Sequence, residues 1–348
     1  MGRLKSRHRF WYGVFQVIDK IFGRNLGKKL TPRSRKLLYE NIESHLKSQG
    51  RGEINVVQRV SSITMNELKT KFIDKNIPVV IEGGAKEWAC CREWSLDYFS
   101  QQHGDDNVTI VGNDVRETPF EIVTLKEVIA NINTEAKKYL RFYPLLTEHP
   151  EHLADFDYKW LRGARGKWSG WEQFQVFIGG KLSKTPVHNA MACNLFIQAY
   201  GEKKWLLYPP ELSAIIDPSP GLNFHRGAPF KSENGPFDPF NPDYSGPYFL
   251  YQYIDAISVH LKPGDIFYNP PHYWHTVENP TDSIGIGYRW LSPSLSFNSA
   301  PLYTFLDMIS APFNRHVYKD RKKDYYLIHL MEQGLYDQYI NEKAKVTT

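Results

Sequence analysis

The sequence has few cysteines, three in 348 residues. Cys90 and Cys91 are adjacent, a spacing at which cysteines rarely bridge each other, and Cys193 stands far from both. The sequence contains no Cys-x-x-Cys pair and no cysteine and histidine spacing typical of a zinc module. The pattern therefore argues against a disulfide-stapled secreted domain. We expect reduced thiols in an intracellular, cytoplasmic protein.

The sequence also lacks a long unbroken apolar run and an excess of one charge. The apolar stretch at residues 10–22 is interrupted by Asp19 and Lys20, is too short to span a bilayer, and is not followed by a small-residue cleavage site. The net charge of +5 comes from acidic and basic residues that are mixed along most of the chain. We therefore expect no transmembrane segment and no nucleic-acid partner.

The same apolar stretch has the spacing of an amphipathic helix, with Phe10, Val14, Val17 and Ile21 on one side. The simplest interpretation is a helix that docks on the body of the protein. The alternative is contact with a membrane surface or with a partner that recognises the basic residues around the helix.

Apolar and aromatic residues are abundant, at 41% and 14% of the chain, so a sizeable core can form. The pattern divides the chain into a basic helical segment at residues 1–52, a strand-rich domain at residues 53–293 and a helical appendage at residues 294–348. Residues 210–260 are rich in Pro, Gly, Asn and aromatics. A loop of this length favours a substrate lid or rim, with a packed surface excursion as the alternative.

Two stretches carry the residues that point to chemistry. The first, Gln175–Pro210, reads as short strands separated by turn residues. If His188 points into the core, alternation along the strands places Ala190 and Asn194 on the same side, barring a bulge. The second stretch, Leu261–Pro280, contains a Pro-Gly-Asp turn, a short strand and a Pro-rich corner that leads to a Trp-His pair.

Together these motifs resemble the cupin-type JmjC oxygenases, and most closely the asparaginyl hydroxylase that inhibits hypoxia-inducible factor. The elements of the resemblance are Thr185-Pro186-Val187-His188, Asn194, Gly201-Glu202-Lys203-Lys204, Tyr208-Pro209-Pro210, Pro263-Gly264-Asp265 and Trp274-His275. The set is specific, although each element alone would be weak. The resemblance implies a mainly β protein with flanking helices, built on a double-stranded β-helix (cupin or jelly-roll), and an enzyme that depends on Fe(II) and 2-oxoglutarate.

The resemblance also assigns residues to roles. His188 and His275 would bind the iron, and Lys203 would hold the distal carboxylate of 2-oxoglutarate. The further positions at which the family supplies donors to this cosubstrate are Thr185, Asn194 and Tyr139. Plainer alternatives are a hydrogen-bonded core histidine, a surface lysine in a hairpin turn, and a role for Tyr143 in place of Tyr139. The C-terminal helices expected at Leu302–Ile309 and Asp324–Ile340 would form a homodimer in the family pattern, or cap the barrel.

The chain departs from the family pattern at Ala190, where the family has the Asp or Glu that completes the iron site. One interpretation is a pseudoenzyme that keeps the barrel as a binding module. A second is another acid, although none lies in the motif strand. The third is a halide in the open position, because the iron- and 2-oxoglutarate-dependent halogenases carry Ala or Gly there.

Fe(II) with two imidazoles and 2-oxoglutarate is near neutral, and chloride would supply the negative charge that the missing carboxylate does not. We therefore predict an active iron enzyme that functionalises an unactivated C–H bond of a peptide, amino-acid or small-molecule substrate. Ala190 favours radical halogenation, with hydroxylation or an inactive binding protein as the alternatives.

Overall fold

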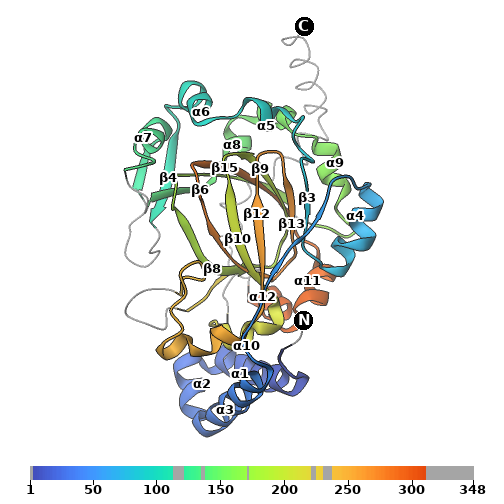
Figure 1. Ribbon diagram of the computed structural model, residues 1–348, viewed down its shortest axis with the longest axis vertical. Helices are drawn as coiled ribbons and strands as arrows, with labels where there is room; N and C mark the ends of the chain where they lie inside the picture. Colours follow the sequence, from blue (N-terminus) through green and yellow to red (C-terminus); the bar gives the residue numbers. More distant parts are fainter. Residues whose placement is uncertain are drawn as a thin grey trace.

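Two β-sheets face each other at the centre of the computed structural model (Figure 1), which describes residues 3–112, 121–134, 138–170, 172–220, 225–229 and 237–310. Within these residues, one sheet has six strands in the order β1 (Ile54–Val56), β12 (Ala256–Leu261), β10 (Lys203–Tyr208), β14 (Trp274–Glu278), β8 (Lys184–Ala190) and β11 (His225–Gly227). The strands from β12 to β11 are all antiparallel to their neighbours, and β1 runs parallel to β12.

The second sheet has nine strands within the same residues. Their order is β2 (Gln58–Val60), β3 (Val79–Ile81), β13 (Ile266–Asn269), β9 (Cys193–Tyr200), β15 (Ser283–Trp290), β7 (Glu172–Gly179), β6 (Lys138–Tyr143), β4 (Asn107–Gly112) and β5 (Glu121–Thr124). The strands from β3 to β5 pair antiparallel. The predicted fold class, two antiparallel sheets packed as a cupin-like sandwich with flanking helices, is confirmed.

Alternation along the strands separates the inside of this barrel from two outer cores. On β9, Phe196 belongs to the cluster between the sheets, whereas Leu195 and Ile197 pack outward. The outer face of the nine-stranded sheet is covered by α4 (Met65–Lys71), η1 (Ile73–Lys75), α5 (Ala89–Glu93), α6 (Leu96–Gln102), α7 (Leu125–Ala130), α8 (Leu145–Glu148), η2 (Pro150–Asp155), α9 (Tyr158–Gly163) and α11 (Pro293–Ser299). The barrel interior is thus sealed by apolar layers on this side.

Helices from the N-terminal segment, from the 210–260 region and from residues 301–310 gather at one end of the six-stranded sheet (Figure 1). The helices that share an apolar cluster with the outer side chains of this sheet are α1 (Ser6–Phe22), α3 (Pro32–Gln49), η3 (Pro210–Leu212), α10 (Ser213–Ile216), η4 (Gly246–Tyr253) and α12 (Pro301–Ser310). Helix α2 (Arg24–Leu30) packs on α1 and α3. Helix α12 matches the helix predicted over Leu302–Ile309. The helix predicted over Asp324–Ile340 lies outside the described residues.

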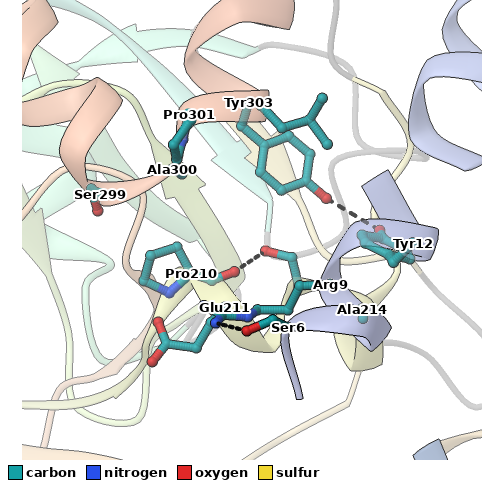
Figure 2. A pocket seen from close by; sticks show the side chains of 12 residues that line it. Ser6, Arg9, Tyr12, Pro210, Glu211, Ala214, Ser299, Ala300, Pro301 and Tyr303 are labelled. Carbon is teal, nitrogen blue, oxygen red and sulfur yellow. Dashed lines mark hydrogen bonds between the residues drawn. The ribbon is translucent and has the colours of Figure 1, made fainter. Parts of the chain in front are cut away.

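Helix α1 packs on the body of the protein, but not through the predicted face, because Phe10, Val17 and Ile21 are exposed. The buried side contains Tyr12 and Phe15 together with polar residues, and the hydroxyl of Tyr12 lies 3.1 Å from that of Tyr303 in α12. Between these helices and η3 lies a pocket of about 300 Å³, lined on its α1 side by Ser6 and Arg9 (Figure 2). No helix in the described part of the chain has the length and hydropathy needed to cross a membrane.

Candidate active site

The two motif histidines meet across neighbouring strands. His188 on β8 is the direct partner of His275 on β14 in the antiparallel register. The centres of their imidazole rings are 4.1 Å apart. Because directly opposed residues share one face of a sheet, both side chains lie on the inner face, where one ion could contact both.

Hydrogen bonds orient the two rings in the same way. Nδ1 of His188 donates to the carbonyl of Pro186, and Nδ1 of His275 donates to the carbonyl of Tyr273, each over 2.9 Å. A proton on Nδ1 leaves the lone pair of the neutral ring on Nε2, the atom that a metal ion requires. Trp205 stacks on His275 with ring centres 5.3 Å apart and so restricts its rotation.

A bulge in β8 decides where Thr185 lies. In a regular strand, residues three positions apart face opposite sides, so Thr185 would point away from His188. The register shifts between His188, which pairs with His275, and Thr185, which pairs with Val277. Because Val277 belongs to the core between the sheets, the bulge brings Thr185 to the inner face as well.

Lys203 on β10 is buried inside the barrel, with 1% of its surface exposed. Its Nζ donates to Asn279 Oδ1 over 2.8 Å and lies 5.5 Å from the ring centre of Tyr139. The alternative of a surface lysine is therefore wrong for Lys203, whereas the neighbouring Lys204 is exposed. An ammonium at this depth favours a nearby anion, because burial removes most of its hydration.

Tyr139 and Tyr143 point to opposite sides of β6, where the register shifts between Leu140 and Tyr143. Tyr139 lies in the core between the sheets, beside Lys203. Tyr143 lies in the outer core and donates a hydrogen bond to Asp106. The structure thus places Tyr139, and not Tyr143, next to the lysine.

Several buried polar atoms between the sheets have no hydrogen-bond partner. Asn194 has two such atoms, Oδ1 and Nδ2. In the register Asn194 lies opposite Asn269 on one side and Arg289 on the other. Asn269 Oδ1 and Arg289 Nε are also unsatisfied, as is Nε1 of Trp205. Buried polar atoms are normally paired, so this group fits a site for a polar ligand.

Arg289 is the site residue that the sequence reasoning missed. It follows Tyr288 in an apolar and glycine-rich strand, SIGIGYRW. A single arginine in such a strand was the only local indication in the sequence that this residue belongs to a site. Burial lowers the pKa of Arg289 to about 10, and Tyr139 opposes this effect. The guanidinium is therefore still charged at neutral pH and provides a second cation, beside Lys203, inside the barrel.

Ala190 lies at the end of β8, two residues beyond His188 on the same face. Its opposite position in the register is His225 of β11, and Gly227 of β11 lies opposite His188. A Cβ added to Gly227 would meet nothing within 4 Å, so the space beside the histidine pair is open on this side. In the described part of the chain, no carboxylate converges with His188 and His275 to form a group of three metal ligands.

Strand β11 brings the 210–260 region to the candidate site and is fixed there by a buried ion pair. Arg226 donates to Asp307 of α12 over 2.9 Å through Nη1 and makes a second contact through Nη2. The guanidinium carbon also lies 4.3 Å from the ring centre of Tyr303. These contacts anchor β11 to α12, and the interpretation of residues 210–260 as a substrate lid or rim stays a prediction.

Two further histidines, one within the second motif stretch and one just before it, take no part in the pair. His272 is fully buried at a positive φ of 63°, and its Nε2 lies 2.9 Å from the Thr304 hydroxyl in α12. His260 is half-exposed beside Glu202. The structure thus brings together His188 and His275, the two motif histidines, and neither His272 nor His260 joins them.

The residues present fit a divalent metal ion and a small dicarboxylate. Two imidazoles offer Nε2 lone pairs, Lys203 and Arg289 supply positive charge, and Asn194 supplies unsatisfied donors and acceptors. The departure from a complete two-histidine, one-carboxylate site is confined to Ala190.

Comparisons with known proteins agree with this architecture. A family described as "Cupin-like domain" matches residues 65–296. The "2-oxoglutarate and iron-dependent oxygenase JMJD4" of Gallus gallus is 24% identical over 306 residues, which cover 79% of this chain and 69% of that protein. The "Arginine-specific demethylase JMJ20" of Arabidopsis thaliana is 22% identical, with 69% of this chain and 58% of that protein covered. The "Lysine-specific demethylase 8" of Danio rerio is 25% identical, with 67% and 58% covered. The chain thus spans less than two-thirds of the length of two of these three relatives.

Proposed function

The chain belongs to the cupin-like domain family, and from this premise we propose that it is a JmjC-type oxygenase that uses Fe(II) and 2-oxoglutarate to oxidise a C–H bond in a protein side chain. The observation that carries the proposal is the pair His188 and His275, whose Nδ1 atoms are both held by backbone carbonyls 2.9 Å away. A histidine pair with a purely structural role does not require that Nδ1 be bound to a backbone carbonyl in both rings. A metal ion shared by the two rings requires the same orientation of both, with Nε2 as the ligand atom.

When bound, iron supplies the chemistry that side chains lack: O2 is reduced while 2-oxoglutarate is oxidised to succinate and CO2, and one oxygen atom goes to the substrate carbon. In this proposal His188 and His275 hold the metal. Lys203, kept in place by Asn279, pairs with the distal carboxylate. Thr185 and Asn194 bind the rest of the cosubstrate, and the barrel walls exclude water from it.

The names of the relatives favour a protein substrate. Two of them are described as arginine-specific and lysine-specific demethylases. Hydroxylation of an N-methyl carbon gives an unstable hemiaminal that releases formaldehyde, so hydroxylation and demethylation are one reaction on different carbons. We therefore favour hydroxylation or demethylation of a side chain that β11 and the neighbouring rim present to the histidine pair.

Halogenation is the second candidate, and Ala190 is the observation that favours it. A methyl group at this position leaves room beside the metal for a small anion, and chloride would supply the charge of the missing carboxylate. No relative named above is described as a halogenase. The two candidates differ only in whether oxygen or halide ends on the substrate carbon.

Mass spectrometry of products from the parent and from Ala190→Asp, each with and without chloride, tests the proposal. We expect the parent to form succinate and an oxidised peptide product, and Ala190→Asp to do so with chloride having no effect. A chlorinated product from the parent alone would establish halogenation.

Binding experiments keep the proposal falsifiable without a known substrate. Under anaerobic conditions, Fe(II) with 2-oxoglutarate should give a visible absorption band in the parent, and His188→Ala should abolish it. His260→Ala removes an exposed histidine and serves as the matched control. If the parent shows no band while Ala190→Asp does, the natural protein is a binding protein and not an oxygenase.

A further inference from the structure

A second group of metal-ligand side chains lies outside the barrel, among the helices that cover the nine-stranded sheet. His103 follows α6, Asp106 precedes β4, and His149 follows α8. One ligand atom of each lies within 4.8 Å of the others, which holds for no other such trio in the described ranges. The ring centres of His103 and His149 are 4.0 Å apart.

A chain of hydrogen bonds holds the ring of His103 in place. Nδ1 of His152 lies 2.7 Å from Asp155 Oδ2, and a carboxylate accepts, so this nitrogen carries a proton. Nε2 of His152 lies 2.7 Å from Nε2 of His103, so one of these two nitrogens donates to the other. When His103 donates, its lone pair lies on Nδ1. Trp94 Nε1 donates to the same Asp155 oxygen over 2.7 Å and so helps to fix this series of hydrogen bonds.

Nδ1 of His103 is buried and has no hydrogen-bond partner, and the residue is 8% exposed. A buried polar atom that stays unsatisfied is costly, so this nitrogen indicates a site for a ligand. An imidazole nitrogen binds a metal ion through its lone pair.

The other two side chains are also held in position. The Tyr143 hydroxyl donates to Asp106 Oδ2, and Nε2 of His149 lies 2.7 Å from the same oxygen. Nδ1 of His149 faces Glu151 Oε1 at 3.6 Å, which favours a proton on Nδ1 once Nε2 binds a cation. Metal ligands are typically supported by outer partners of this kind.

We propose that His103, Asp106 and His149 bind a divalent transition-metal ion of the Zn²⁺ type. Two imidazoles and one carboxylate suit Zn²⁺, Co²⁺ or Fe²⁺ and disfavour Mg²⁺ and Ca²⁺, which prefer oxygen ligands. Three protein ligands leave a fourth position for water. The ion would join the ends of α6 and α8 to the start of β4 and so tie together two helices and an outer strand of the nine-stranded sheet.

Metal titration of the full-length chain tests the site. The background is the variant His188→Ala/His275→Ala, which removes the barrel pair, so the outcome is independent of the proposed oxygenase activity. We expect this variant to bind one equivalent of Zn²⁺ by calorimetry and to give visible absorption bands with Co²⁺. Adding Asp106→Asn, which keeps the size of the side chain, should weaken binding by more than about 100-fold, because a ligand is lost and not merely an outer partner.

His149→Gln gives a second test, because His149 is partly exposed and its loss leaves the buried pair of His103 and His152 intact. His149→Gln should weaken Zn²⁺ binding to a similar extent. It therefore tests the site even if Asp106→Asn disturbs folding. The matched control is His260→Gln, which removes a surface histidine that also faces a carboxylate, and it should leave the affinity unchanged. Two results would show that the cluster is a hydrogen-bonded network only. One is that the background variant binds Zn²⁺ no more tightly than a surface histidine does. The other is that adding Asp106→Asn or His149→Gln leaves the Zn²⁺ affinity of the background variant unchanged.

Discussion

Substitution of Lys203 by methionine isolates the charge that the proposed cosubstrate site depends on. Methionine keeps the length and apolar contacts of the side chain but removes the ammonium, which is 2.8 Å from Asn279 Oδ1 and 1% exposed. Hydrogen bonds to charged groups contribute about 1.5–3 kcal/mol. Since about 1.4 kcal/mol corresponds to a factor of ten, the Kd for 2-oxoglutarate should rise roughly 10- to 100-fold.

Calorimetry under anaerobic conditions with Fe(II) measures this change. Lys204→Met is the matched control, because it removes the same charge one residue further along β10 from an exposed position. A 2-oxo monocarboxylate lacks the distal group and should bind the parent and Lys203→Met equally well. If Lys203→Met leaves the Kd for 2-oxoglutarate unchanged, or if Lys204→Met changes it as much, Lys203 does not hold the distal carboxylate.

Two further predictions concern the supports of the site. Gly179→Ala should raise the Kd for 2-oxoglutarate in calorimetry, because the new Cβ would lie 2.4 Å from the ring of Tyr139; an unchanged Kd would mean that this ring does not order the site. Arg226→Met should lower the free energy of unfolding in urea by about 3–5 kcal/mol at pH 8, since it leaves Asp307 buried and uncompensated. Burial raises the pKa of Asp307 to about 6, and Arg226 opposes this rise, so the pKa should be higher still without the arginine. Protonation of Asp307 removes the cost of burying an unpaired carboxylate. The loss of unfolding free energy caused by Arg226→Met should therefore be smaller at pH 5 than at pH 8. An equal loss at both pH values would show that Asp307 is not the cause.

The sequence predicted the parts of the site that depend on local spacing. His188 and His275 were each identified within a motif, and strand alternation then placed Ala190 on the same face as His188. Lys203 was separated from Lys204 by its position in the turn motif, and the structure buries the first and exposes the second. Their roles as metal and cosubstrate ligands stay predictions that the experiments above test.

Other features depend on contacts between distant segments and have no local pattern. The bulge that turns Thr185 inward appears only in the register between β8 and β14. Arg226 pairs with Asp307 across 81 positions of the sequence, and His149 meets Asp106 across 43. No periodicity of two or 3.6 residues marks such pairs, because each is fixed by how the sheets and helices pack.

The charge inside the barrel links Ala190 to the choice of substrate. Lys203 and Arg289 together bring two positive charges, and no carboxylate of the described residues converges with His188 and His275. In the proposed function, a divalent metal ion would add two more positive charges, and 2-oxoglutarate would neutralise two of the four. An Asp at position 190 would remove one of the remaining charges, whereas Ala190 would leave both in a region of low dielectric constant, where unbalanced charge is costly. On this proposal a further anion would be favoured, supplied by chloride or by an acidic group next to the reacting carbon of a substrate. The identity of the anion that binds would then decide between halogenation and hydroxylation.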